Sequence, residues 1–278
     1  MKNILKIMLM MITIFTIAGS AVYAAEIPVS DQDQLITSSD WTEISNLQDE
    51  MKKEEPDATI DYDKALKVYV DCNLIKLQTA DTKKLTSALE SANYVWVIPF
   101  KMEKTYGMFT VAKGLPLREE AKSVLTKAEQ EEVKNHAGKW MITEIAEHTV
   151  ETYYDILLEK REALSDCTRV VLVGSQPGMR QPVALGMDDE TARIWISLGY
   201  QYPVMEKIPE TQNVESGVYS FESVAEISDT YIEDSEVSTG AGVQSRSSMK
   251  YVAGIGIIVI GSILILSVLK KKKLEDYE

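Results

Sequence analysis

The chain has 278 residues, of which 45% are hydrophobic and 26% are charged, and its formal net charge at pH 7 is −14. This length allows one or two domains, and the hydrophobic fraction is high enough to build a buried core. The acidic balance argues against nucleic acid as a partner, because phosphate groups attract basic surfaces. Hydrophobic segments at both ends argue against a cytosolic enzyme.

The first 24 residues have the organisation of a secretory signal peptide. Lys2 and Lys6 form a short basic region, residues 7–18 are apolar, and residues 22–24 read Val-Tyr-Ala. The apolar stretch is shorter than the roughly 20 residues that span a bilayer, and small or aliphatic residues follow it. We therefore expect cleavage after Ala24, the alternative being an uncleaved N-terminal anchor.

The other end of the chain predicts a transmembrane helix. Residues 251–269 carry no charged side chain, and four lysines follow at 270–273. Nineteen helical residues reach about 28 Å, close to the hydrocarbon thickness of about 30 Å. The lysines mark the cytoplasmic side. We expect a single-pass type I protein of the cell membrane, with residues 270–278 in the cytoplasm and the bulk of the chain outside.

The end of the chain resembles the C-terminal region of Gram-positive bacterial surface proteins, in which an apolar span is followed by lysines. Those proteins carry a Leu-Pro-x-Thr-Gly sorting signal just upstream of the span, whereas residues 238–242 read Ser-Thr-Gly-Ala-Gly here. The resemblance implies a location at the bacterial cell surface. The missing Leu-Pro indicates a permanent membrane anchor rather than covalent attachment to the wall.

Charge divides the exported part into three segments. Residues 25–60 hold ten acidic and two basic side chains, residues 61–205 hold 21 and 18, and residues 206–245 hold nine and one. An acidic segment with few apolar runs buries too little surface to offset the entropy of ordering. We therefore expect one folded extracytoplasmic domain at 61–205, an acidic N-terminal segment at 25–60 and a disordered acidic stalk at 206–250.

The acidic N-terminal segment contains one helix signal. Apolar residues recur with helical spacing from Trp41 to Met51, Asp40 is a suitable N-cap, and Pro56 ends the pattern. We expect a helix at about 41–54 that packs its Trp41 face on the domain.

The first half of the domain predicts both strands and helices. Residues 66–77 alternate as a strand does, and Asp81 caps a short helix that ends near Asn93. The β-forming run at 94–98 and its return at 108–113 predict a hairpin.

The second half begins with a capping box formed by Thr126 and Glu129, which predicts a helix up to Gly138. Residues 139–147 fit a strand or a helix, and an amphipathic helix is expected over 150–164. Three short strands with hairpin-length connections follow, at 169–173, 182–187 and 193–198. The pattern favours an α+β fold with a mixed, mainly antiparallel sheet and packed helices over a doubly wound parallel sheet.

Cys72 and Cys167 are the two cysteines of the chain, and each adjoins a predicted strand. Outside the cytoplasm a disulfide between them could persist and would close a loop of about 95 residues. The alternative is two independent thiols, because spacing alone does not give the distance between the Cα atoms. Two cysteines without a Cys-x-x-Cys motif do not complete a structural zinc site.

The sequence Glu-Ile-Ala-Glu-His at 144–148 resembles the zinc-binding His-x-x-Glu-His motif of inverted zinc peptidases, with Glu144 in place of the first histidine. On a helix, Glu144, His148 and Glu151 would share a face and could hold a divalent ion. On a strand, Glu144 and His148 would lie about 13 Å apart, too far for one metal. A solvated polar surface is the favoured alternative, and no metal or other cofactor is expected.

A glycine-containing loop at 174–178 follows a predicted strand, the position at which such loops can cradle phosphate. Ser175 and Arg180 are the candidate ligand-binding residues there, Arg180 for an anionic ligand. The loop lacks the P-loop, dinucleotide-binding and nucleophile-elbow patterns, so a plain turn is the alternative.

Taken together, these features favour a non-catalytic binding or interaction module, anchored in the membrane and facing an envelope protein or the cell wall. The alternative is an envelope enzyme such as a metal-dependent hydrolase, which would need the side chains at 144–151 to converge in a pocket.

Overall fold

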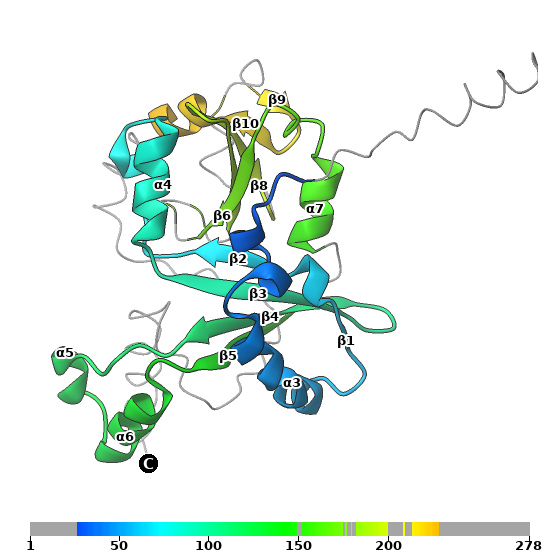
Figure 1. Ribbon diagram of the computed structural model, residues 1–278. Helices are drawn as coiled ribbons and strands as arrows, with labels where there is room; N and C mark the ends of the chain where they lie inside the picture. Colours follow the sequence, from blue (N-terminus) through cyan, green and yellow to red (C-terminus); the bar gives the residue numbers. More distant parts are fainter. Residues whose placement is uncertain are drawn as a thin grey trace, which may run out of the picture.

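The computed structural model describes residues 27–148, 152–174, 176, 179, 182–199, 208 and 213–227. It has an α+β fold built on one ten-stranded, mainly antiparallel sheet, as the sequence predicts (Figure 1). The expected signal peptide, transmembrane span and cytoplasmic tail lie outside the described residues. Within the described ranges, no helix has both the length and the apolar character needed to cross a bilayer.

The strands pair antiparallel throughout except for β2 with β6. In their order across the sheet they are β5 (Trp140–His148), β4 (Tyr106–Lys113), β3 (Tyr94–Lys101), β2 (Leu66–Tyr69), β6 (Arg169–Val173), β7 (Val183–Met187), β8 (Ala192–Ser197), β10 (Val218–Ser220) and β9 (Asn213–Glu215), with β1 (Thr59–Ile60) beside β3.

Helices precede, connect and follow these strands. They are α2 (Trp41–Ile44), α3 (Gln48–Glu54), α4 (Thr82–Glu90), α5 (Glu119–Lys122), α6 (Lys127–His136), α7 (Tyr153–Glu159) and a last helical segment at 221–227. Short 3-10 turns are η1 (Asp31–Asp33), η2 (Leu35–Thr37), η3 (Ser45–Leu47), η4 (Tyr62–Lys64) and η5 (Ile75–Leu77).

Two of the predicted helix caps are confirmed. The Asp81 carboxylate accepts the backbone N–H groups of Lys83 and Lys84 at the start of α4. Thr126 and Glu129 form the reciprocal capping box of α6. Local sequence fixes both helix starts, because each cap needs only residues two or three positions away. Of the ambiguous residues 139–147, all but Lys139 belong to strand β5.

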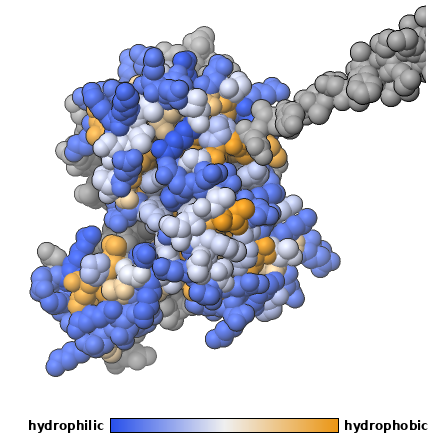
Figure 2. Space-filling view, in the orientation of Figure 1, coloured by the Kyte–Doolittle hydropathy of each residue, from blue (hydrophilic) through white to orange (hydrophobic). Residues whose placement is uncertain are grey.

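Alternation along the strands builds a core on each face of the sheet. On β6, Val170 and Leu172 pack in the cluster that contains Leu157 of α7. Val171 and Val173 point to the opposite face, into the cluster that contains Leu85 of α4. A third cluster, on the same face as the second, lies under the N-terminal helices and contains Trp96, Phe109 and Met51. The face shown in Figure 2 is mostly hydrophilic, with hydrophobic residues in small groups.

The N-terminal acidic segment is part of the folded unit, which therefore begins well before residue 61. The expected helix at 41–54 forms as α2, η3 and α3, and it buries Ile44 and Met51 completely. The predicted cap role of Asp40 is wrong. Its carboxylate accepts the Tyr94 hydroxyl and the Trp96 indole N–H instead of the helix backbone.

Residues 28–35, hereafter the N-terminal wedge, lie between the two halves of the sheet. Strands β2 and β6 are paired over two residues only, Val68 with Leu172 and Tyr69 with Val173. Where they diverge, Val29 bridges to Val170 of β6 and Gln34 bridges to Leu66 of β2 (Figure 1, dark blue segment). The wedge thus completes the join between the half containing β2 to β5 and the half containing β6 to β10.

The expected disordered stalk at 206–250 is wrong for residues 213–227. These residues form β9, β10 and the last helical segment, and Val218, Tyr219 and Val224 are fully buried or nearly so. The sequence did not predict these strands, because each has only three residues and the surrounding segment is polar and acidic. Residues 228–250 lie outside the described part of the chain.

Candidate functional site

Of the two alternatives for the cysteines, a disulfide or two independent thiols, the structure has the thiols. Cys72 and Cys167 are both free and buried, and they belong to core clusters on opposite faces of the sheet. Burial raises the pKa of each thiol to about 11. Because the thiolate is the reactive species, both thiols are protonated and weakly nucleophilic at neutral pH.

This burial predicts slow thiol chemistry. With the full-length chain in detergent at pH 8, we expect an aromatic disulfide reagent to label neither cysteine until a denaturant is added, and then to label both. Counting the released thiolate by absorbance, with and without denaturant, checks the prediction. A disulfide would instead give no labelling in denaturant without a reductant.

The metal candidates at 144–151 are not brought together by the residues described. Glu144 and His148 are four residues apart on β5, where they pair with Thr110 and Tyr106 of β4. A strand rises about 3.3 Å per residue, so their Cα atoms are about 13 Å apart, which does not fit a shared ion. Glu151 lies outside the described residues. Within the described chain, no group of three His, Cys, Asp or Glu side chains could hold a metal.

The ligand-binding candidates Ser175 and Arg180 lie outside the described residues. Gln176, in the same loop, is buried and makes three hydrogen bonds. Its amide oxygen accepts from Leu74 N, and its amide nitrogen donates to the carbonyls of Cys72 and Gly174. These bonds tie the loop after β6 to the segment after β2.

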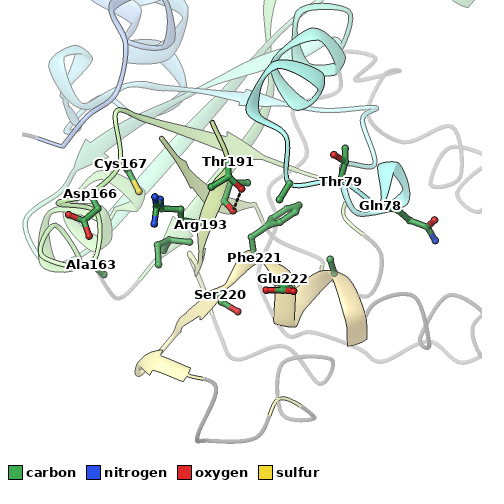
Figure 3. A pocket seen from close by; sticks show the side chains of 14 residues that line it. Gln78, Thr79, Ala163, Asp166, Cys167, Thr191, Arg193, Ser220, Phe221 and Glu222 are labelled. Atoms are coloured by element: carbon green, nitrogen blue, oxygen red, sulfur yellow. Dashed lines mark hydrogen bonds between the residues drawn. The ribbon is translucent and has the colours of Figure 1, made fainter. Parts of the chain in front are cut away.

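A hollow of about 660 Å³ lies at the edge of β8 (Figure 3). Its lining comes from the segment after η5, the loop after α7, the start of β8, the end of β10 and the last helical segment. The lining residues are Gln78, Thr79, Ala80, Ala163, Asp166, Cys167, Thr191, Ala192, Arg193, Ile194, Ser220, Phe221, Glu222 and Ala225.

The hollow lies where two segments each pair with only part of the same edge of β8 and leave a gap between them. Strand β10 pairs with β8 from Ile194 onward, with Ser220 opposite Ile194. Before the gap, Asp81 bridges to Thr191, and the Ala192 N–H donates to the Ala80 carbonyl. Arg193 lies in this gap, because β10 pairs only from Ile194 onward and the other segment only up to Ala192.

A β-bulge places Arg193 in the gap. In the pairing of β7 with β8, Gly186 lies opposite Ile194 and Met187 lies opposite Ala192, so Arg193 is the additional residue. Bulges commonly re-aim a side chain beside a functional site. The sequence does not single out Arg193, because its role depends on strand register and one isolated arginine in a strand carries no signal of register.

The guanidinium of Arg193 is held in one orientation by Asp188. Its Nε donates to Asp188 Oδ2, while Asp188 Oδ1 accepts the backbone N–H groups of Glu190 and Thr191. These three donors lower the pKa of Asp188, with the backbone donors contributing most. The Arg193 side chain is half exposed, at 51%. A turn that fixes the carboxylate therefore also orients the arginine toward the hollow.

Acidic side chains line the same hollow as Arg193. Asp166 lies beside Cys167 on the side of Arg193, while Thr79 and Gln78 lie opposite (Figure 3). Attraction to Asp188, and more weakly to Asp166, raises the pKa of Arg193. Glu222 lines the hollow from the last helical segment, next to Phe221. Neither Asp166 nor Glu222 has an ion-pair partner within the described ranges. The hollow thus presents charges of both signs.

A second cluster of charged groups is buried between the wedge and the sheet. Asp33, 2% exposed, accepts the Tyr69 hydroxyl at 2.7 Å, the Ser30 hydroxyl at 2.6 Å and Arg169 Nη2 at 2.9 Å. Lys67 Nζ lies 3.8 Å from Asp33 and 4.6 Å from the centre of the Tyr94 ring. Burial lowers the pKa of Lys67. Asp33 thus neutralises charge that the interior would otherwise leave uncompensated, although Arg169 Nε has no hydrogen-bond partner among the described residues, and we assign this cluster to stability.

Comparison with known proteins assigns neither site. No family model, curated protein or solved structure matches the chain.

Proposed function

We propose that this chain is a membrane-anchored, single-pass type I protein that presents its α+β domain outside the cytoplasm as a non-catalytic binding module. The signal-peptide pattern at 1–24 and the apolar span at 251–269 support this location. The observation that carries the binding role is the hollow at the edge of β8, which gathers polar and charged side chains around a defined space.

The size and chemistry of the hollow support binding of a small molecule or a short segment of a partner. Ligand pockets usually enclose roughly 300–1,000 Å³ and combine apolar walls with a few placed polar groups. Here Phe221 and several alanines supply the apolar walls, and Arg193 is the oriented polar group. The thiol that lines the hollow, Cys167, is protonated at neutral pH because of its raised pKa, which argues against a thiol nucleophile.

A thermal-unfolding screen of the full-length chain in lipid nanodiscs tests the binding role. The panel would contain cell-wall peptides, amino sugars and divalent metals with and without EDTA. A ligand at 100 times its Kd adds about 2.7 kcal/mol, which should raise Tm by several degrees. We expect a wall fragment to raise Tm and the variant Ala163→Phe, which fills the hollow, to abolish the shift.

Ala128→Phe is the matched control, because Ala128 is exposed on α6, outside the hollow. A panel with no active compound, or a shift that survives Ala163→Phe, would contradict binding at this site. A metal-induced shift reversed by EDTA would favour the hydrolase alternative. Protease treatment of intact cells tests the location, since residues 27–227 should be digested from outside.

A further inference from the structure

We infer that the hollow beside β8 binds a short zwitterionic ligand, such as a free peptide, with the ligand carboxylate on Arg193 and its ammonium group attracted by the carboxylates of Asp166 and Glu222, which line the same hollow. This inference rests on the proposed binding function and specifies its ligand.

The arginine has one edge of its guanidinium group that Asp188 does not occupy. A guanidinium offers five N–H donors in a planar fork, and its side facing Nε is already bound to Asp188. The end of the fork that carries both Nη atoms is the edge that binds a carboxylate through two parallel hydrogen bonds. Because Asp188 is itself fixed by two backbone N–H groups, Arg193 is oriented before any ligand arrives. Such preorganisation reduces the entropic cost of binding.

The charged side chains around the hollow do not balance one another. Arg193 is matched by Asp188, so Asp166 and Glu222 leave an excess of negative charge around the hollow. A ligand carrying only a carboxylate would meet this excess as repulsion. A ligand that also carries an ammonium group compensates this excess, because the acidic side chains of the lining attract the cation while the anion binds Arg193.

The volume of the hollow and its uncharged lining residues suit a short peptide. A space of about 660 Å³ falls in the range that holds a drug-sized molecule, larger than a single small amino acid needs. Thr79, Ser220 and Thr191 supply hydroxyl groups, and Phe221 supplies an apolar surface between the two sides. These groups suit the amide bonds and small side chains of a short peptide.

The test compares three probes on the full-length chain in nanodiscs by titration calorimetry. They are trialanine, N-acetyl-trialanine, which lacks the ammonium group, and trialanine amide, which lacks the carboxylate. We expect trialanine to bind about tenfold or more tightly than either capped probe, because a hydrogen bond to a charged group is lost with each cap.

Two sets of variants test which residues cause the preference for a free carboxylate and which cause the preference for a free ammonium group. Arg193→Gln should remove the difference between trialanine and its amide. The double variant Asp166→Asn, Glu222→Gln should remove the difference between trialanine and the acetylated probe. Glu162→Gln and Arg118→Gln are the matched controls, since both residues are exposed and neither lines the hollow. The readout is a ratio between probes on one variant, so a modest loss of stability does not affect it.

The outcomes separate this inference from the proposed function. Equal binding of all three probes, or preferences unchanged by the variants, would overturn the inference and leave the binding function standing. If none of the three probes bound, the inference would also be overturned. The proposed binding function would still stand if a compound of the thermal-unfolding panel raised Tm and Ala163→Phe abolished that shift. If no panel compound bound either, both would fail.

Discussion

Replacement of Asp33 by alanine is expected to lower the free energy of unfolding by about 3–5 kcal/mol, the usual cost of removing one partner of a buried ion pair. Asp33 is 2% exposed and accepts hydrogen bonds from Tyr69, Ser30 and Arg169. Without it, the cations of Arg169 and Lys67 remain in the interior without their closest counter-charge. The same substitution removes one of the contacts by which the wedge joins the two halves of the sheet, since Tyr69 belongs to β2 and Arg169 to β6.

Urea unfolding of the full-length chain, followed by tryptophan fluorescence, measures this loss as a shift of the midpoint. Asp31→Ala is the matched control, because Asp31 is an exposed aspartate in the same 3-10 turn and should cost less than about 0.5 kcal/mol. Asp33→Asn keeps the shape and removes the charge, and it should still cost more than the control. A loss below about 1 kcal/mol for Asp33→Ala would show that the cluster does not stabilise the fold.

Gly186→Ala is expected to cost about 1–3 kcal/mol because a Cβ at this position overpacks the core. It would lie 2.7 Å from Cys167 Sγ and 3.0 Å from Leu164 Cδ2, in the cluster covered by α7. The sulfur of Cys167 therefore occupies the space that the glycine leaves empty. This contact also supports the hollow, since Cys167 is part of its lining.

A double-mutant cycle tests this explanation. Cys167→Ala removes the sulfur, so Gly186→Ala should cost less in the Cys167→Ala background, by roughly 0.5–3 kcal/mol of coupling. Leu164 remains close, so the rescue is expected to be partial. Gly174→Ala is the control, because the atoms nearest to a Cβ there would be 3.4 Å away or more, which is ordinary van der Waals contact. Additive costs would show that the sulfur is not the obstacle.

Sequence patterns predicted the fold where the determinants are local. The caps at Asp81 and Thr126 act over two or three residues, and the hairpin of β3 and β4 follows from two β-forming runs joined by a short loop. Both were read correctly because the partners are neighbours in the chain. The fold class follows from the same short connections, which favour antiparallel pairing.

The predictions failed where the determinants are far apart in the chain. Asp33 contributes to the acidic character of the N-terminal segment, yet its partner Arg169 is 136 residues away, so composition alone assigned Asp33 to solvent. For this reason composition did not indicate that residues before 61 contribute to the same core. The site depends on Arg193, whose placement requires the bulge against β7, and one sequence without the register contains no sign of that bulge.

The N-terminal wedge also determines the order in which this protein can complete its fold. A chain that is exported from its N-terminus delivers residues 28–35 first, but their partner Val170 follows more than 130 residues later. If the chain is exported, as we propose, its early segments remain without their partner until β6 has also been delivered, and the join between the two half-sheets stays open until then. Contacts of such long sequence separation slow folding. If the signal peptide is cut after Ala24, as we propose, the wedge is released only a few residues from the new chain end, and signal cleavage and closure of the sheet become successive steps of one maturation.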